Sequence, residues 1–317
     1  MGLRVGLLST ANINRLVLGG AGASDDVEVV AVASRNEARA EAYAREHGIP
    51  RAHGSYEELL ADDGVDAVYV SLPNSLHVDW SVQALEAGKH VLCEKPLARR
   101  PEEVARAFDA AERAGRVLAE AFMYRHHPQT KRIAELVRDG AVGEPRTIRA
   151  VFSFPLADVE NIRMKPELEG GALMDVGCYC VSGARLLAGE PERVYGEQRL
   201  GGGGVDTTFA GVLRFPGDVV GVFHCSMDLP SRQELEVLGT EGTLLVQAPW
   251  RVDFGGDVLL NGERVDVPEA DSYRLELDDF AAAVRGEREP LLGREDALGQ
   301  ARAIDRLYSS AESGSPA

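Results

Sequence analysis

Cysteine is scarce in this chain, with only 4 among 317 residues. They are too few and too irregularly spaced to form the disulfide framework of a small secreted protein. Cys178 and Cys180 lie two residues apart in a stretch with helical spacing, so they point in different directions and make a poor metal pair. We therefore expect reduced, buried thiols and no metal site. The four are Cys93, Cys178, Cys180 and Cys225.

Long apolar runs and an excess of positive charge are also absent. No run of about 18 apolar residues occurs, and the N-terminal MGLRVGLLST opens into a strand without a signal-peptide pattern. Acidic residues outnumber basic residues by 51 to 34, which gives a formal net charge of −17. Such a surface repels polyanions and disfavours nucleic acid and anionic membranes as partners. We expect a cytoplasmic protein without a membrane segment.

Lysine is rare, because arginine supplies most of the 34 basic residues. One of the few lysines, Lys95, stands between Glu94 and Pro96 directly after an apolar run. An ammonium group can change its protonation when partly desolvated, whereas a guanidinium group effectively cannot. The carboxyl end of a strand is also where open α/β sheets place their chemistry. The stretch alone leaves two interpretations open, namely a reactive lysine or a strand-end lysine in salt contact with Glu94.

Apolar strands and amphipathic helices alternate up to about residue 119. Val27 to Ala33 is a continuous apolar run, typical of a strand that is buried on both faces. Glu37 to His47 reads as a helix that ends at Gly48. Alternation with short connections implies a doubly wound parallel sheet. We expect further strands at Leu3 to Leu8, Val65 to Val70, His90 to Cys93 and Val117 to Ala119, and further helices from Asn12, from Ser55, at Ser75 to Ala87 and at Pro101 to Ala114.

The pattern changes in the second part of the chain, where successive strands are joined by turns. This arrangement favours a large, mainly antiparallel open sheet. Because 317 residues exceed a typical single core, we expect an α/β domain at 1–122 and an α+β domain at 123–317. The expected strands are Arg146 to Phe154, Arg193 to Arg199, Thr207 to Phe215, Val219 to Met227, Gln233 to Gly239 and Thr243 to Ala248, and the expected helices are His127 to Arg138, Ala172 to Leu187, Glu276 to Arg285 and Glu295 to Ala311.

A dinucleotide site is expected after the first strand, but the usual G-x-G-x-x-G is missing. Its places are held by Ser9, Ala11 and Asn14. Small Ala11 still admits a phosphate close to the backbone, and Ser9, Thr10 and Asn12 can donate hydrogen bonds to it. The loop alone is equally consistent with an ordinary turn from strand to helix.

The end of the second strand is more informative. NAD-binding proteins usually place a carboxylate there to hold the ribose hydroxyls, whereas this chain has Ser34 and Arg35. These two side chains can hydrogen-bond and neutralise a 2′-phosphate, so we expect NADP rather than NAD. The alternative is a solvated arginine, which the dipole at a helix start would slightly disfavour.

Asp175 and Tyr179 stand four residues apart after a glycine pair, in a stretch with helical spacing. They would share one face of a helix. A phenol near an ammonium group has a lowered pKa and can exchange a proton with a sugar hydroxyl. A structural hydrogen-bonded pair is the alternative.

Together these motifs resemble the glucose-fructose oxidoreductase, inositol dehydrogenase and MocA (Gfo/Idh/MocA) family. Many members have histidine where this chain has Tyr179. A tyrosine there is similar to the branch of NADP-dependent D-xylose 1-dehydrogenases and dimeric dihydrodiol dehydrogenases. The shared features are EKP at Glu94 to Pro96, SLPN at Ser71 to Asn74 with His77 after it, and GG-x-x-x-D-x-x-x-Y at Gly170 to Tyr179; STANI at Ser9 to Ile13 and EAFMYRHHPQ at Glu120 to Gln129 point to the branch.

The resemblance implies a role for each motif. Lys95 would be the catalytic lysine, Tyr179 the proton carrier and Asp175 a group that orients the substrate. The first domain would have a Rossmann fold. The cofactor would be lined by Ser9, Thr10, Ala11, Asn12, Ile13, Ser34, Arg35, Leu72, Asn74, His77, Glu94 and Lys95. The substrate would contact Lys95, Asp175, Tyr179, Arg125 and Arg163, and surface salt bridges are the alternative for both arginines.

These roles imply a reversible hydride transfer between NADP and a carbon that bears a hydroxyl group. C1 of an aldopyranose such as D-xylose is the expected position, with a lactone as product. No metal is needed, because Lys95 and Tyr179 can carry the proton and NADP the hydride. Two alternatives are an NADPH-dependent ketosugar reductase, including one that acts on a nucleotide-linked sugar, and a non-catalytic NADP-binding sensor. The presence of Lys95, Asp175 and Tyr179 argues against the sensor.

The expected antiparallel sheet would leave one broad face free of helices. An uncovered apolar face is a liability in a monomer. We therefore expect a homodimer or homotetramer that assembles through the C-terminal sheet.

Overall fold

The computed structural model describes residues 2–317. The chain divides into two compact units, each with its own sheet. The first unit contains the chain up to Ala98 together with Glu102–His126 and Asp271–Leu298. The second contains Arg99–Pro101, His127–Ala270 and Gly299–Ala317. Neither unit is one continuous stretch of sequence, and the domain boundary between residues 122 and 123 stays a prediction.

The first unit contains a six-stranded sheet in the order β3-β2-β1-β4-β5-β6. All of its neighbouring strands pair in parallel, so the predicted doubly wound sheet is confirmed. The strand order reverses between β1 and β4, and open α/β sheets bind ligands beyond the carboxyl ends of the strands at such a point. The strands are β1 (Leu3–Leu7), β2 (Val27–Ala33), β3 (Arg51–His53), β4 (Ala67–Val70), β5 (His90–Glu94) and β6 (Leu118–Ala121).

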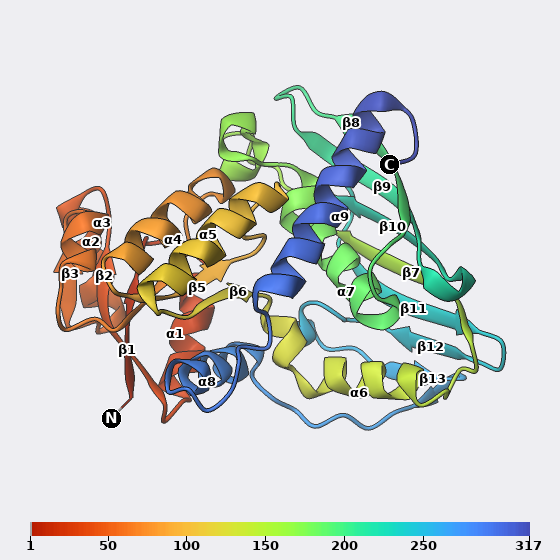
Figure 1. The fold of residues 1–317 in the computed structure, drawn as a ribbon, viewed down its shortest axis with the longest axis horizontal. Coiled ribbons are helices and arrows are strands. Elements are labelled where there is room, and N and C mark those ends of the chain that lie inside the picture. The colour runs from red at the N-terminus through yellow and green to blue at the C-terminus, as the bar shows by residue number, and fades with distance from the viewer. Residues whose placement is uncertain (1) are drawn as a thin grey trace. The chain divides into compact units, whose positions relative to one another are not determined.

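A helix from late in the sequence belongs to this unit (Figure 1). In α8, the backbone of Tyr273 lies 2.8 Å from the position that a Cβ on Gly20 of α1 would occupy, so the two helices approach closely. Asp271 caps α8 and starts it four residues earlier than the predicted Glu276. The helices of this unit are α1 (Asn14–Gly22), α2 (Glu37–His47), α3 (Tyr56–Leu60), α4 (His77–Glu86), α5 (Pro101–Ala114, from Glu102 on) and α8 (Ser272–Val284), with 3-10 turns η1 (Asn74–Leu76) and η2 (Met123–His126).

The second unit contains an eight-stranded sheet in the order β14-β13-β12-β11-β7-β10-β9-β8. Only β7 and β10 pair in parallel, so the predicted mainly antiparallel sheet is confirmed. The strands are β7 (Pro145–Ser153), β8 (Arg193–Leu200), β9 (Asp206–Arg214), β10 (Val220–Ser226), β11 (Arg232–Gly239), β12 (Thr243–Val246), β13 (Val258–Leu260) and β14 (Glu263–Arg264).

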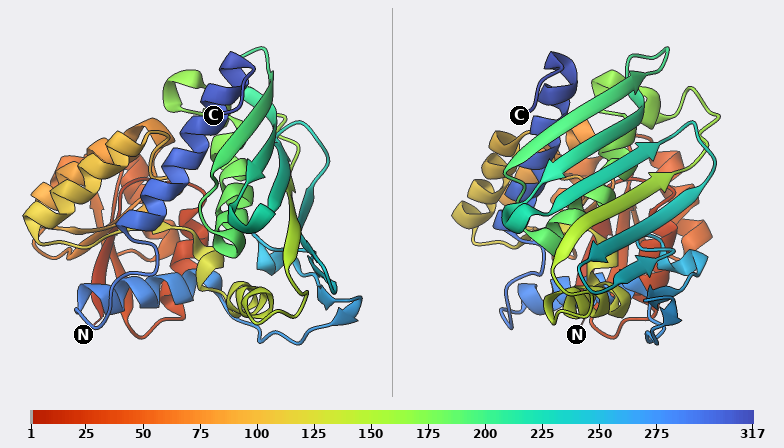
Figure 2. Two further views of the ribbon diagram at one scale, coloured as in Figure 1. Left: turned by 45° about the vertical axis from the view of Figure 1, so that its right-hand side comes forward. Right: turned by 90° about the vertical axis from the view of Figure 1, so that its right-hand side faces the viewer.

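Helices cover one face of this second sheet. Helix α7 packs on β7 and β10, and the outer face of the strands carries no helix among the described residues of the unit (Figure 2). On that outer face Tyr195 pairs with Val212, and both side chains are exposed. The helices are α6 (Pro128–Arg138), α7 (Cys178–Ala188) and α9 (Arg294–Ser313, from Gly299 on), with the π-helical turn η5 (Leu173–Gly177) and 3-10 turns η3 (Ile162–Met164), η4 (Pro166–Leu168), η6 (Pro216–Asp218) and η7 (Val252–Phe254).

Three general features of the chain complete the description. Within residues 2–317, no helix is both long enough and apolar enough to cross a membrane. The same residues contain no group of three or more His, Cys, Asp or Glu side chains arranged to hold a metal ion. All four cysteines are buried, and none is in a disulfide.

Candidate functional site

The loop after β1 is fixed to the end of β4 by Ser9. The Ser9 hydroxyl donates to the carbonyl oxygen of Ser71 over 3.0 Å and lies 2.8 Å from the Ser71 hydroxyl. It also accepts the backbone N–H of Ala11 over 3.1 Å. Asn14 is buried and donates its amide to the Ser9 carbonyl oxygen over 2.8 Å. Ser9 and Asn14 therefore shape the turn in place of the missing glycines.

The amino end of α1 has the features of a phosphate-binding helix start. Its first turn contains no acidic residue. Among residues 2–317, no acceptor is found for the backbone N–H groups of Asn12 and Ile13. Backbone N–H groups and the positive end of the helix dipole favour an anion at such a position. The arrangement fits the pyrophosphate of a dinucleotide.

The end of β2 carries a basic residue, Arg35, although the whole chain carries a charge of −17. Ser34 is buried there, and its hydroxyl accepts the backbone N–H of Asn36 over 3.3 Å. Arg35 is exposed. Burial raises the pKa of Tyr56, and the nearby charges of Arg35 and Arg39 oppose that rise. Arginine beside a hydroxyl, without a carboxylate, fits a 2′-phosphate.

Both ends of the loop that carries Lys95 are anchored by side-chain hydrogen bonds, and Tyr69 and Glu120 among these side chains are buried. Tyr69 of β4 donates its phenol to Oε1 of Glu94, while the backbone N–H of Lys95 donates to Oε2 of Glu94 over 3.2 Å. On the other side, the backbone N–H of Leu97 donates to Oε1 of Glu120 over 2.7 Å. The backbone of Lys95 is therefore held at the carboxyl end of β5.

His77 adds a further anchor to this loop. Its Nδ1 lies 2.9 Å from the carbonyl oxygen of Pro96, and its Nε2 lies 2.8 Å from that of Leu72. His77 and Leu72 are buried, whereas Asn74 is partly exposed at the start of η1. Ser9, Ser71, Leu72, His77 and Lys95 are therefore linked through one set of contacts at this edge of the sheet. Their contact with a cofactor stays a prediction.

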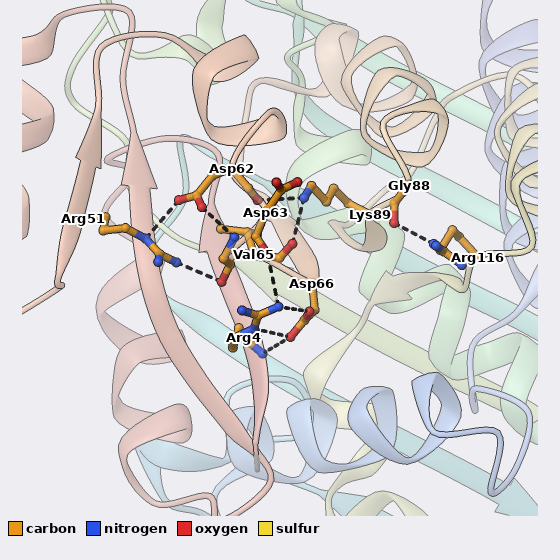
Figure 3. A network of polar contacts seen from close by, with 10 residues as sticks. Arg4, Arg51, Asp62, Asp63, Val65, Asp66, Gly88, Lys89 and Arg116 are labelled. Carbon is orange, nitrogen blue, oxygen red and sulfur yellow. Dashed lines mark hydrogen bonds and ion pairs between the residues drawn. The ribbon is translucent and has the colours of Figure 1, made fainter.

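Lys89, which opens the same stretch of sequence, has a different environment (Figure 3). It is buried before the start of β5, and its Nζ donates to the carbonyl oxygens of Asp62 and Val65 over 2.8 Å each. Burial lowers its pKa. Arg4 completes this network through Asp66, with Nη2 to Oδ1 at 2.6 Å. The network lies at the amino ends of the strands, away from Lys95, and holds the sheet together.

Two arginines predicted on the substrate side both form ion pairs. Nη1 of Arg125 lies 3.4 Å from Oδ1 of Asp296 within the first unit. Nε of Arg163 lies 2.8 Å from Oδ2 of Asp175 within the second unit. Both arginines therefore form salt bridges, as the alternative interpretation proposed. The substrate roles of Arg125 and Arg163 stay predictions.

Asp175 and Tyr179 belong to the second unit, whereas Lys95 belongs to the first. Asp175 lies in the π-helical turn η5 and Tyr179 in the first turn of α7, so the regular helix expected from residue 172 contains a local π segment. π turns of this kind are frequent at functional sites. Tyr179 is buried, with its ring centroid 5.5 Å from that of Phe152, edge-on, and 6.2 Å from that of Trp250. These aromatic rings fix the orientation of the phenol.

Two family models match the chain. Residues 3–122 match the model described as oxidoreductase family, NAD-binding Rossmann fold, and residues 130–245 match the GFO/IDH/MocA C-terminal domain. The chain belongs to the Gfo/Idh/MocA oxidoreductase family. The family predicted from the EKP and GG-x-x-x-D-x-x-x-Y motifs is confirmed.

This Gfo/Idh/MocA oxidoreductase is similar to dehydrogenases and to a reductase. It is 44% identical to D-xylose 1-dehydrogenase (NADP(+)) 2 of Haloferax volcanii, over 98% of this chain and 97% of the relative. It is 35% identical to trans-1,2-dihydrobenzene-1,2-diol dehydrogenase of Mus musculus, over 84% and 80%. The crystal structure of KijD10, a 3-ketoreductase from Actinomadura kijaniata in complex with NADP and TDP-benzene, has a TM-score of 0.92, 32% identity and 98% coverage of both chains.

Three buried polar side chains near the loop of Lys95 were not predicted from the sequence of this Gfo/Idh/MocA oxidoreductase. Tyr69 and Glu120 hold the loop of Lys95 from neighbouring strands. Glu276 of α8 is buried close enough to Glu94 for the charge of Glu94 to raise its pKa, although burial contributes most to the rise. Of the three, only Glu120 could have been recognised from the sequence. Its carboxyl group stands inside the apolar run LAEAF at Leu118 to Phe122, where a charged residue is unusual.

Proposed function

We propose that this Gfo/Idh/MocA oxidoreductase uses NADP to oxidise C1 of an aldopyranose such as D-xylose to the lactone. The observation that carries the proposal is the loop of Lys95, whose backbone is anchored through Glu94, Glu120 and His77 at the carboxyl end of β5. Such anchoring presents one ammonium group at the edge where parallel sheets bind ligands. The 44% identity to an NADP-dependent xylose dehydrogenase supports the choice of substrate.

NADP would be held at the carboxyl ends of β1, β2 and β4. Ser9 to Ile13 would contact the pyrophosphate, and Ser34 and Arg35 the 2′-phosphate. Leu72, Asn74, His77 and Glu94 would line the remainder of the cofactor. When bound, NADP⁺ supplies the acceptor for the hydride that leaves C1.

The remaining chemistry is the removal of one proton from the hydroxyl group on C1. Nζ of Lys95 and the phenol of Tyr179 are the groups proposed to take and pass on this proton. Asp175, paired with Arg163, would orient the sugar hydroxyl. The hydride and the proton together account for the two hydrogens lost when the lactone forms.

The test is nicotinamide absorbance after the protein is mixed with NADP⁺ or NAD⁺ and a panel of aldoses, polyols and cyclic diols. We expect reduction of NADP⁺ by a pentose or hexose, with NADP⁺ preferred over NAD⁺. A nucleotide-linked ketosugar is the second candidate substrate, because the chain shares its fold with a 3-ketoreductase at 32% identity. Activity only with NADPH and ketosugars would move the reaction away from C1. Cofactor binding without turnover on any substrate would favour the sensor.

The open face of the second sheet is proposed to form a dimer or tetramer. Tyr195 and Val212 lie next to each other on this face, and both are exposed. Burial of such apolar surface between copies of the chain would stabilise the assembly. Light scattering at micromolar concentration that gives the mass of a monomer would contradict this part of the proposal.

A further inference from the structure

Asp206 is a buried carboxyl group at the start of β9, with 3% of its surface exposed. Its Oδ2 accepts the backbone N–H of Leu173 over 2.7 Å. Its Oδ1 accepts the phenol of Tyr308 over 2.9 Å. All three residues belong to the second unit, so Asp206 joins β9, the π turn η5 and helix α9.

The contact with Leu173 lies at the amino end of the helical segment that carries Asp175 and Tyr179. The first N–H groups of a helix have no partner within it. The residue that precedes η5 is Ala172, whose side chain cannot accept a hydrogen bond. Asp206, 33 residues further along the chain, supplies the acceptor instead. Its negative charge also suits this end of the helix.

Gly171 leaves the space that the carboxyl group of Asp206 fills. A Cβ at this position would lie 2.1 Å from Oδ1 of Asp206, and the φ of +124° is one that other residues rarely adopt. The same turn also holds the Arg163 loop, because the N–H of Gly171 donates to the carbonyl oxygen of Arg163 over 2.9 Å. Arg163 in turn pairs with Asp175. The glycine pair, Asp206 and the ion pair therefore form one connected structure.

We propose that Asp206 is a positioning residue for Tyr179 and Asp175, which it orients by holding the amino end of their shared helical segment. The inference rests on the proposed function in one respect, since Tyr179 is taken as the group that carries the proton. Asp206 itself touches no reacting atom in this scheme. It acts through Leu173 and the segment that follows.

The charge on Asp206 depends on its surroundings. Burial raises its pKa to about 6, while the N–H of Leu173 and the phenol of Tyr308 oppose the rise. The guanidinium group of Arg99 lies 4.1 Å from the centroid of the Tyr308 ring, and the thiol of Cys225 faces Asp206 from β10. Above about pH 6 the carboxylate accepts from both donors, whereas below it a proton occupies one of the two oxygens. The neutral acid, like the amide of asparagine, still offers one oxygen to the N–H of Leu173.

The experiment compares Asp206→Ala and Asp206→Asn in the full-length protein, at a temperature where circular dichroism shows both to be folded. Asp206→Asn keeps an oxygen for the N–H of Leu173, and Asp206→Ala does not. We expect kcat to fall at least about tenfold in Asp206→Ala and to remain within about threefold of the parent in Asp206→Asn, with unchanged NADPH affinity in both.

Asp228→Ala is the control for loss of a carboxylate elsewhere in the second unit. Asp228 is exposed, accepts from the hydroxyl groups of Ser226 and Thr208 and pairs with Arg199, but it contacts no helix end. This variant should keep the parent kcat. Amide hydrogen exchange across residues 171–179 provides a readout that needs no substrate, and it should be about tenfold faster in Asp206→Ala than in Asp228→Ala. Parent values of kcat and exchange in Asp206→Ala would overturn the inference. If the parent protein oxidises or reduces no substrate, the proposed function fails, and unchanged exchange in Asp206→Ala would then refute the cap separately.

Discussion

Nδ1 of His77 lies 2.9 Å from the carbonyl oxygen of Pro96, and this contact ties the start of α4 to the loop that carries Lys95. Nε2 of the same ring lies 2.8 Å from the carbonyl oxygen of Leu72. A neutral imidazole has one N–H and donates to only one of these oxygens, whereas an imidazolium would donate to both. Burial nevertheless outweighs both carbonyl groups and lowers the pKa of His77 to about 4. The ring is therefore neutral at pH 7.

This depressed pKa makes the folded state sensitive to acid. In the unfolded chain a histidine binds its proton near pH 6.5, so between pH 6.5 and pH 4 the unfolded state binds more protons than the folded state. Neutral His77 therefore contributes fully to the free energy of unfolding above this window. About 2 kcal/mol of that free energy should be lost between pH 7 and pH 5. His77→Gln cannot take up the proton and should lose this part of the acid sensitivity. Urea unfolding of both proteins at pH 7 and pH 5 measures the difference; an equal loss in the two would contradict the prediction.

Removal of the proposed proton-carrying ammonium group should stop the chemistry without releasing the cofactor. For Lys95→Ala we expect kcat to fall by about three orders of magnitude, since general acid–base catalysis contributes about 10²–10⁴. NADPH affinity, measured by fluorescence titration, should change little. Lys131→Ala, in the exposed part of α6, is the matched control and should keep the parent kcat. Near-normal turnover of Lys95→Ala would rule out the assigned role.

The fold could be predicted from the sequence because its main signals are local. The apolar run Val27 to Ala33 became β2 with the same bounds, and the helix expected at Glu37 to His47 became α2, which is capped by Asn36 and Gly48. Strands of two or three residues, such as β3 and β14, have too little periodicity to be recognised. Local patterns also did not indicate that α8 belongs to the first unit.

The candidate site was only partly predictable, for a physical reason. Lys95 and His77 are recognisable as members of motifs, but the groups that hold them are brought in by tertiary structure. Tyr69 reaches Glu94 from a neighbouring strand, 25 residues away in sequence. From the sequence, Glu120 is only an acidic residue in an apolar strand. Its role becomes clear from the structure, in which it accepts the N–H of Leu97. Contacts of this kind depend on strand register, which a single sequence does not specify.

Arg35 should decide between the two nicotinamide cofactors. It is exposed next to the buried hydroxyl of Ser34, where a 2′-phosphate would need a cation. Removal of a charge-assisted hydrogen bond costs about 1.5–3 kcal/mol, so Arg35→Ala should raise KM for NADP⁺ by roughly 10- to 100-fold. KM for NAD⁺ should stay the same, because NAD⁺ lacks the phosphate. Arg45→Ala, in the last turn of α2, the helix that follows Arg35, serves as the control. A similar rise in the KM values for NADP⁺ and NAD⁺ would show that Arg35 does not bind the 2′-phosphate.

Lys89 should matter for stability and not for turnover. Its Nζ donates to two backbone carbonyl oxygens, those of Asp62 and Val65, and methionine would leave both without this donor. The loss should lower the free energy of unfolding by about 2 kcal/mol. Lys131→Met, on an exposed position, should change it by less than about 0.5 kcal/mol. Denaturant unfolding measures both variants, and kcat should match the parent in both. An unchanged unfolding midpoint in Lys89→Met would contradict the prediction.

Glu276 should make the protein less stable as the pH rises. The side chain is 2% exposed, and its Oε1 has no hydrogen-bond partner among residues 2–317. Burial, with the charges of Glu94 and Asp279, raises the pKa of Glu276 well above its usual range. The folded state therefore keeps a proton that the unfolded chain releases above about pH 4.3.

Because the folded state binds the extra proton, this group stabilises the fold fully only below the pKa of the unfolded chain. Its contribution then falls by about 1.4 kcal/mol per pH unit until the folded pKa is reached. Glu276→Gln is neutral at every pH, so its stability relative to the parent should rise from pH 5 to pH 8. The free energy of unfolding of Glu276→Leu, relative to the parent, should rise with pH in the same way. This result would show that the rise comes from the lost charge and not from hydrogen bonds of the glutamine. Urea unfolding at pH 5, 6.5 and 8 provides the measurement. A difference that stays constant across these values would mean that Glu276 is ionised in the folded protein, and its carboxylate would then need a cationic partner that residues 2–317 do not provide at Oε1.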